Sequence, residues 1–265
     1  MATILEVQNL YKAFGGVKAV VDVSFNLKDG QLLAMIGPNG AGKSTCFNLI
    51  NGQLRPNHGD IFIMGKNVNG SKPRDVWNLG VGRTFQITST FASMSVLENV
   101  QMAQLSYHKR TKSLLQKVSR LYVEESMALL KLLGIEDQAE RACGVLAYGD
   151  LKRVELAVAL ANKPKLLLMD EPTAGMGPSE AQNLMELTKD IVHTQNIGVL
   201  FTEHDMALVF NHADRIIVLN RGELAAEGTA DEVQANEKVK EIYLGHGQSA
   251  GIGKKELIPA DSKKA

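Results

Sequence analysis

Eight residues at positions 37–44, GPNGAGKS, have the spacing of a loop that holds phosphate groups. In the pattern GxxxxGK(S/T), glycines let successive backbone N–H groups curl around phosphate oxygens, and the lysine, here Lys43, reaches the β and γ phosphates of a nucleotide. The hydroxyl of Ser44 can ligate Mg²⁺, and the N-terminus of a following helix adds a favourable dipole. The alternative is a glycine-rich turn that happens to carry a lysine. The motif predicts nucleotide binding.

Two acidic residues supply a complementary chemistry. Asp170 and Glu171 end the run LLLMDE, directly after four apolar residues. An aspartate there can hold Mg²⁺ through water, and the adjacent glutamate can orient or deprotonate an attacking water molecule. Two acids after an apolar strand are commonly only a solvated strand end. Together with the phosphate loop, however, they favour a hydrolytic site.

Three further side chains could take part. His204, in LFTEHD, follows another apolar run, where a donor could reach a γ-phosphate, although a lone histidine is more often structural. Gln86, in GRTFQ, is a weaker candidate, because a glutamine after a phenylalanine indicates little by itself. Phe14, in YKAFGGVKAV, is either a core aromatic or a platform on which an adenine ring stacks. The sequence does not choose between these two roles.

A parallel sheet would bring these candidates together. The apolar runs at 31–36, 165–170 and 197–204 predict buried strands, and each leads directly to candidate chemical residues. Ligands of an α/β sheet bind at the carboxyl ends of its strands. Helical patterns lie between the strands, as at 180–195, so we expect a mostly parallel α/β core.

Other segments surround this core. Residues 21–28 alternate from Val21 onward between apolar and polar, which predicts a half-exposed strand, and 215–228 predicts a hairpin that turns near residues 220–222. The stretch from about 88 to 150 has apolar residues spaced by three and four, which predicts an inserted helical lobe. The Gly-, Ser- and Lys-rich end, 246–265, predicts a flexible tail.

The composition limits the class of protein. The 265 residues are 45% apolar, enough for one large core or a core with a small lobe, and 29 basic residues balance 29 acidic ones. This balance removes the usual argument for binding nucleic acid or anionic lipid. Cys46 and Cys143 lie in no metal-binding pattern, so we expect a reducing cytosol. We expect neither a signal peptide nor a membrane span, which needs roughly 18 to 20 apolar residues.

Taken together, the motifs resemble those of the ATP-binding cassette (ABC) family, the nucleotide-hydrolysing subunits of membrane transporters, over about residues 5–244. The resemblance implies an α/β fold of the P-loop NTPase type, with a mostly parallel core sheet, an antiparallel β subdomain and an inserted helical subdomain. It also implies one nucleotide-binding domain over residues 1–245, with ATP and Mg²⁺ as cofactors.

The same resemblance implies a role for each candidate residue. Phe14 stacks on adenine, and Gln86 senses both Mg²⁺ and the membrane partner. The implied catalytic residues are Lys43, Glu171 and His204. The implied Mg²⁺ ligands are Ser44, Gln86 and Asp170. The implied phosphate loop comprises Gly37, Pro38, Asn39, Gly40, Ala41, Gly42, Lys43, Ser44 and Thr45.

Within the family, the segments GGVKAVVDVSF and YGDLKRVELAVALANKP and the ending EIYLG look like the subgroup that serves importers of branched-chain amino acids, with relatives that take up urea or other small organic solutes. A lipopolysaccharide-export ATPase is similar in length and ending, but Tyr148 and Gly149 favour the importers. The implied partners are permease subunits, a second ATPase subunit and, indirectly, a solute-binding protein, with no nucleic acid. The implied location is the cytoplasmic face of the inner membrane.

One motif departs from the family pattern. Where the family has LSGGQ, this chain has LAYGD at 146–150, so that Ala147 replaces the serine and Asp150 the glutamine. In the family the serine hydroxyl and the glycine amides, here of Gly149, meet the γ-phosphate of ATP bound by the opposite subunit of a head-to-tail dimer. Ala147 cannot donate that hydrogen bond, and bonds to charged groups contribute about 1.5 to 3 kcal/mol. We expect a weakened partner site and an intact site of the chain's own.

Two further expectations concern this region. Asp150 can cap a helix that starts near Leu151, although its charge competes with phosphate for the helix dipole. Gly177, in AGMGP, stands where the family usually has aspartate or asparagine, so communication between the two ATP sites is in doubt.

Two other functions stay open at this point. One is a soluble cassette ATPase without a transporter. The other is an ATP-binding regulatory subunit that hardly hydrolyses, which Ala147 and Asp150 favour and Glu171 and His204 oppose. The sequence specifies neither the solute nor whether the partner ATPase subunit is identical.

Overall fold

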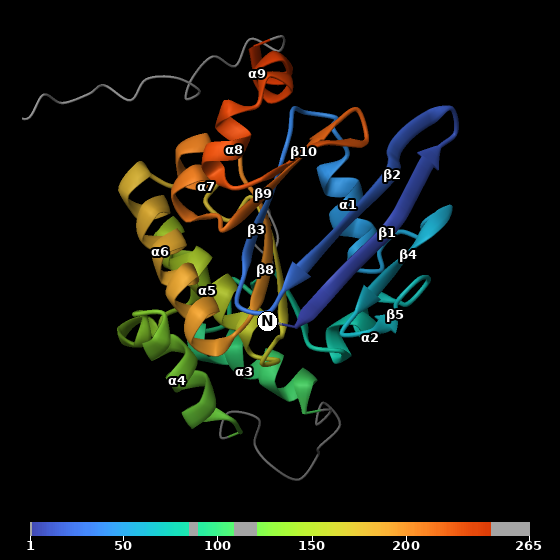
Figure 1. Cartoon of the computed structure of the whole chain (residues 1–265). Helices are drawn as coiled ribbons and strands as arrows, with labels where there is room; N and C mark the ends of the chain where they lie inside the picture. The colour runs from blue at the N-terminus through green and yellow to red at the C-terminus, as the bar shows by residue number, and fades with distance from the viewer. Residues whose placement is uncertain (1, 85–89, 109–120, 245–265) are drawn as a thin grey trace, which may run out of the picture.

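A six-stranded sheet lies at the centre of the computed structural model, which describes residues 2–84, 90–108 and 121–244 (Figure 1). The strand order is β10-β9-β3-β8-β7-β6, and every neighbouring pair is parallel except β10 with β9. The three predicted apolar strands form its middle, which confirms the mostly parallel core. The strands are β3 Leu32–Ile36, β6 Val81–Thr84, β7 Leu166–Asp170, β8 Gly198–Thr202, β9 Arg215–Asn220 and β10 Glu223–Gly228.

Both faces of this sheet are covered. Ala34 and Ile36 of β3 belong to a core shared with α5, α6 and α7, whereas Leu33 and Met35 belong to a second core shared with α1 and the other sheet. A strand that is buried on both faces has no polar side, which explains the continuous apolar runs. The helices are α1 Lys43–Ile50, α5 Tyr148–Leu160, α6 Pro178–Gln195 and α7 Met206–His212.

The second sheet is antiparallel and has the order β2-β1-β4-β5. Its side chains alternate as predicted from Val23 onward, where every second residue is buried. The prediction for Val21 was wrong: Val20 is fully buried and Val21 only half-buried, because Asp22 has a φ of 52° and interrupts the alternation. The elements are β1 Thr3–Phe14, β2 Val17–Lys28, β4 His58–Ile63 and β5 Lys66–Asn67, with α2 Pro73–Asn78 between β5 and β6.

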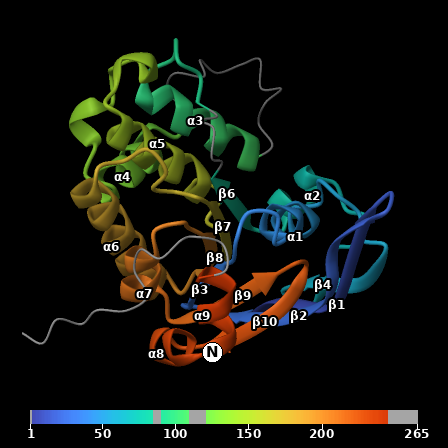
Figure 2. The ribbon, with the colours of Figure 1, turned by 90° about the horizontal axis from the view of Figure 1, so that it is seen from above.

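The helical lobe lies to one side of the central sheet (Figure 2). Helices α3, Val96–Tyr107, and α4, Val123–Leu132, pack against each other and against α5. The 3₁₀ turns η2 Glu136–Gln138 and η3 Cys143–Val145 connect α4 to α5. The predicted limits of the lobe, 88 and 150, stay a prediction.

The start of α5 differs from the prediction. The helix begins at Tyr148 with Ala147 as its N-cap residue, so Asp150 lies in the first turn instead of capping a helix that starts at Leu151. Ala147 adopts an extended conformation with φ −61° and ψ 151°, as N-cap residues do. An acidic residue is stabilising both at the N-cap and inside the first turn of a helix. Asp150 is therefore compatible with either start of α5 and did not determine where the helix begins.

The C-terminal part begins with the predicted hairpin of β9 and β10, which turns through Arg221 and Gly222. Helices α8, Ala230–Ala235, and α9, Glu237–Leu244, complete it. The predicted tail, 246–265, lies outside the described residues. Within the described ranges, each helix is too short or too polar to cross a membrane.

Candidate nucleotide site

The loop between β3 and α1 has backbone conformations that favour glycine. Gly37 and Gly42 have φ angles of 149° and 105°. A Cβ atom at Gly37 would collide with the carbonyl oxygen of Leu219, and one at Gly42 with that of Ala19. The loop is therefore packed tightly against β9 and β2, and its amides are held where α1 begins.

Lys43, the first residue of α1, folds back over this loop. Its Nζ donates to the carbonyl oxygens of Gly37 at 2.6 Å and Pro38 at 3.3 Å, and the residue is only 8% exposed. Burial lowers the pKa of Lys43, while the charges of Glu171 and Asp170 raise it. The ammonium group thus lies within electrostatic range of both predicted carboxylates.

Asp170 ends β7 and is held from two sides. Thr202, at the end of the parallel strand β8, donates its Oγ1 proton to Asp170 Oδ1 at 2.9 Å, and Arg83 Nη2 lies 3.7 Å from Oδ2. Arg83 also donates to Asn48 on α1 at 3.1 Å. Burial lowers the pKa of Arg83, and Asp170 raises it. Neither Thr202 nor Arg83 was predicted from the sequence, although each lies at or next to the end of a strand.

Glu171 and His204 form the closest pair of predicted catalytic groups. His204 Nε2 lies 2.7 Å from Glu171 Oε1, and the two side chains are 49% and 18% exposed. Glu171 has a φ of 49°, and its N–H donates to Thr202 O at 3.2 Å and Thr202 Oγ1 at 3.1 Å. Thr202 of β8 therefore holds Glu171, through both its carbonyl and its hydroxyl oxygen, in an unusual conformation at the mouth of the site.

A buried carboxylate supports this pair from behind. Glu203 is 4% exposed and accepts hydrogen bonds from Thr173 N at 2.8 Å, Thr173 Oγ1 at 2.6 Å and His204 N at 3.2 Å. Burial raises the pKa of Glu203, whereas these hydrogen bonds lower it. Glu203 was not predicted from the sequence, because an acidic residue before a histidine carries no signal of burial.

The loop, Glu171 and His204 border one pocket of about 320 Å³. Phe14 also lines it, and its side chain is too exposed, at 46%, for a core aromatic. Lys12 Nζ lies 5.2 Å from the centre of the Phe14 ring. The ring is therefore open for stacking, the second of its two possible roles. Of the phosphate loop, the pocket lining includes Asn39, Gly40, Ala41, Gly42, Lys43, Ser44 and Thr45.

Ala147 and Gly149, the two predicted contacts of the partner's ATP, lie away from the phosphate loop in the sequence and in another element. Ala147 and Gly149 do not line this pocket; they are at the N-terminus of α5, where Ala147 is exposed and its side chain caps no backbone N–H of the described chain. A Cβ atom on Gly149 would lie 3.5 Å from the carboxyl group of Glu180. Gly177 is the N-cap residue of α6. Gln86 lies outside the described residues.

Tyr243 of α9 is a further neighbour of the loop that sequence analysis missed. Its side chain is buried, and its hydroxyl has no hydrogen-bond partner of good geometry in the described part of the chain. Burial raises the pKa of Tyr243, and the nearby backbone N–H of Gly37 lowers it. The C-terminal helix thus packs beside the first residue of the phosphate loop.

Comparison with known proteins agrees with this geometry. Residues 20–174 match the family model described as ABC transporter, and residues 223–248 match one described as branched-chain amino acid ATP-binding cassette transporter. The high-affinity branched-chain amino acid transport ATP-binding protein LivG of Salmonella typhimurium is 38% identical over 252 residues, covering 91% of this chain and 98% of LivG. The corresponding BraF of Pseudomonas aeruginosa is 36% identical over 250 residues, with the same coverage of 91% and 98%.

Solved structures show the same architecture. The ADP conformation of an ATP-binding cassette of an ABC transporter superposes with a TM-score of 0.83 at 32% identity, covering 92% of this chain and 100% of that one. A dimeric cassette in a post-hydrolysis state, bound to ADP and Pi, superposes with a TM-score of 0.72 at 26% identity, covering 86% and 99%.

Proposed function

Because the chain belongs to the ABC transporter family, as a nucleotide-binding ATPase subunit, we propose that it drives the import of branched-chain amino acids or a related small organic solute. The observation that carries the choice of solute is the match of its C-terminal part, residues 223–248, to a model of branched-chain amino acid transporters. The similarity to LivG and BraF over 91% of the chain supports the same class.

The residues that line the pocket have different roles in the proposed hydrolysis of ATP. The loop amides and Lys43 bind the phosphates, and the exposed ring of Phe14 stacks on adenine. Glu171 orients the attacking water and accepts its proton, and His204, 2.7 Å from Glu171, holds that carboxylate and donates toward the γ-phosphate.

Ser44, at the start of α1, and Asp170, at the end of β7, fit a Mg²⁺ ion that arrives with the nucleotide. Ser44 is exposed in the first turn of α1, and the Asp170 carboxylate is oriented by Thr202, so both present the hard oxygen ligands that Mg²⁺ prefers. No cluster of three or more His, Cys, Asp or Glu side chains among the described residues offers an alternative metal site. When bound, the ion neutralises phosphate charge. We assign Ser44, Asp170 and Gln86 as its protein ligands.

The partner of this chain is a second cassette. Ala147 is exposed and Gly149 half-buried at the start of α5, and both lie outside the pocket, so they contact ATP held by the opposite subunit of a head-to-tail dimer. The dimeric cassette among the similar structures supports such an assembly. Gln86 couples the dimer to permease subunits at the cytoplasmic face of the membrane, and a solute-binding protein delivers the solute to them.

Transport by the assembled complex tests this proposal. The tagged chain is purified from membranes with its copurifying permease, reconstituted into liposomes and assayed for ATP-driven uptake of labelled leucine and of labelled urea, with the Glu171→Gln complex as the inactive control. We expect leucine uptake that the variant abolishes. Purification without any membrane protein, or uptake that is the same in the variant, would contradict the proposal.

A further inference from the structure

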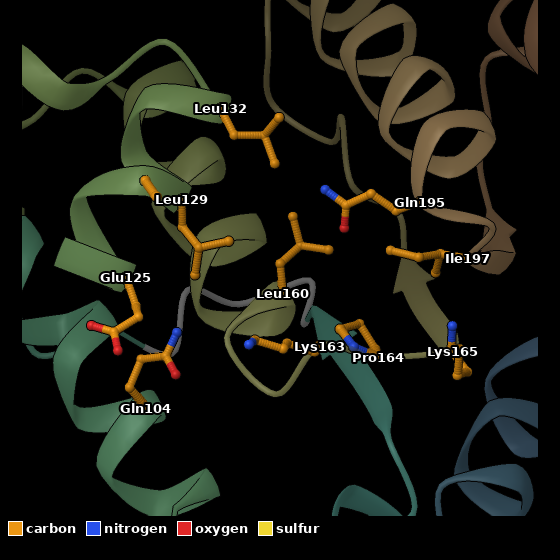
Figure 3. Close-up of a pocket in the computed structure, with 11 residues that line it drawn as sticks. Gln104, Glu125, Leu129, Leu132, Leu160, Lys163, Pro164, Lys165, Gln195 and Ile197 are labelled. Atoms are coloured by element: carbon orange, nitrogen blue, oxygen red, sulfur yellow. The ribbon is translucent and has the colours of Figure 1, made fainter. Parts of the chain in front are cut away.

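A second cavity, of about 520 Å³, lies at the opposite end of the central sheet (Figure 3). It lies between the helical lobe, the end of α6 and the segments that enter β7 and β8. Lys165 and Ile197 line it and directly precede these strands, whereas the nucleotide pocket is at their carboxyl ends. Each strand has five residues, or about 16 Å at 3.3 Å per residue, so the two cavities are separate.

One part of the cavity wall is aliphatic. Leu129 and Leu132 of α4 face Leu160 of α5 in Figure 3, and Ile197 lies on the α6 side. Leu132 is 37% exposed although it is a large apolar residue. Its exposure at the cavity leaves apolar surface that an aliphatic group could cover, at about 25 cal/mol per Å² of area removed from water.

The other part of the wall carries two kinds of polar group. Gln104 of α3 is 2% exposed, and its Oε1 atom accepts no hydrogen bond from the described part of the chain. Glu125 of α4 lines the same side of the cavity. Lys163 and Lys165, both exposed, flank Pro164 on the loop into β7; Lys163 points toward the side where Gln104 lies, whereas Lys165 lies on the other side, near Ile197 (Figure 3).

These groups specify a ligand with three parts. A buried carbonyl oxygen without a donor is costly and is satisfied by an N–H group, and a neighbouring carboxylate favours that group as a cation. Lys163, which points to the same side, favours a carboxylate on the same ligand. The leucines favour a branched aliphatic body. A fatty acid or dicarboxylate would leave Gln104 unsatisfied and place like charge beside Glu125.

We infer that this cavity binds a free aliphatic α-amino acid, such as leucine, with its ammonium group at Gln104 and Glu125, its carboxylate at Lys163, and its side chain against Leu129 and Leu132. Such a ligand bridges the helical lobe and the strands of the core. The inference stands on the cavity itself and does not require the proposed function. If the imported solute is also such an amino acid, this site reports its concentration on the cytoplasmic side.

Calorimetric titration of the full-length chain with L-leucine tests the inference. We expect saturable binding of one leucine per chain. Two analogues each lack one pole: 4-methylpentanoate has no ammonium group and isopentylamine has no carboxylate. Each should bind at least about tenfold more weakly, because each loses charge-assisted hydrogen bonds.

Substitutions locate the site. Gln104→Leu removes the unsatisfied acceptor at similar volume, so it should fold and weaken leucine binding about tenfold or more. Lys163→Gln should do the same, whereas Lys66→Gln, at an exposed lysine on β5, is the matched control and should bind leucine normally. No saturation at millimolar leucine, or equal affinity in all variants, would overturn the inference.

The outcomes separate this inference from the proposed function. Leucine uptake by the reconstituted complex without leucine binding to the isolated chain overturns the inference alone, and binding without uptake overturns the proposed function alone. The cavity residues could instead bind no amino acid and become protected from hydrogen exchange in the complex with the permease. That result would show that the permease covers this surface, and it would also overturn the inference.

Discussion

Glu171 and His204 meet because β7 and β8 are parallel and in register. Asp170 pairs with Thr202 across the two strands, so the residues that follow each strand emerge side by side, 33 positions apart in the sequence and 2.7 Å apart in space. Sequence indicates the end of each strand but not its neighbour in the sheet. It could therefore predict both residues as candidates and could not predict their contact, nor the support from Thr202 and Glu203.

Glu203 gives a pH-dependent prediction at this scale. Burial raises the pKa of Glu203 in the folded state above the ordinary 4.5 of the unfolded chain. At a pH between these two pKa values, the folded state therefore holds more protons than the unfolded state. The stability that Glu203 contributes is therefore fully present below pH 4.5 and is lost as the pH rises through the raised value. Glu203→Gln removes this titration. We expect the stability advantage of wild type over the variant to shrink from pH 4.5 to pH 8.

Urea denaturation of both proteins at several pH values measures this difference. Thr173→Val, which removes one hydrogen bond to Glu203 and leaves the carboxyl group, is the control and should keep the pH trend of the wild type. A difference that stays constant with pH would show that Glu203 has an ordinary pKa in the folded state, and one that grows with pH would show a lowered pKa. Either result would contradict the prediction.

At the scale of elements, the central strands were predictable and some boundaries were not. The runs that form β3, β7 and β8 are almost entirely apolar. Such a run is stable only where both of its faces are buried, which in this fold is the middle of the central sheet. The start of α5 was misplaced because Ala147 has no capping side chain to mark it. In β2, alternation failed at Val21 because the left-handed conformation of Asp22 has no sequence signal that distinguishes it from a regular strand residue.

The phosphate loop gives a prediction at the same scale. Gly42→Ala places a Cβ atom at a φ of 105° and against the carbonyl oxygen of Ala19, so the loop must shift away from β2. Backbone strain of this kind costs about 1 to 3 kcal/mol. We expect ATP affinity to fall about tenfold or more, measured with a fluorescent ATP analogue.

Gly16→Ala is the matched control for this substitution. Gly16 lies in the hairpin between β1 and β2 and has no left-handed φ, and no described atom lies within 4 Å of a Cβ built there. Its affinity for the analogue should equal that of wild type. Equal affinity in the Gly42→Ala protein as well would show that the loop tolerates the side chain.

At the scale of the whole molecule, the proposed function requires a second chain at each ATP site. The pocket is lined by the phosphate loop, Glu171 and His204, whereas Ala147 and Gly149, at the start of α5, do not line it. A partner that supplies a complete LSGGQ motif would complete this chain's site, and this chain would offer its partner a weaker one. The sequence of one chain cannot predict which motif its partner supplies, because each site would be formed by two chains.

Ala147→Ser tests the weak half of the dimer. Serine at the N-cap of α5 should add about 0.5 to 2 kcal/mol of stability. In a dimer of identical chains it should also donate to the γ-phosphate and raise ATP turnover roughly ten- to a hundredfold. Ala235→Ser, at an exposed position on α8, is the control and should change neither quantity. Added stability without added turnover would show that Ala147 faces no phosphate.

The most direct test of the central claim, that Glu171 activates water for ATP hydrolysis, is the ATP turnover of the purified chain beside Glu171→Gln, with Glu223→Gln at an exposed position as control. Loss of the general base should lower turnover about 10² to 10⁴-fold while ATP still binds, and the control should be unaffected. A Glu171→Gln protein that hydrolyses ATP as fast as wild type would contradict the account.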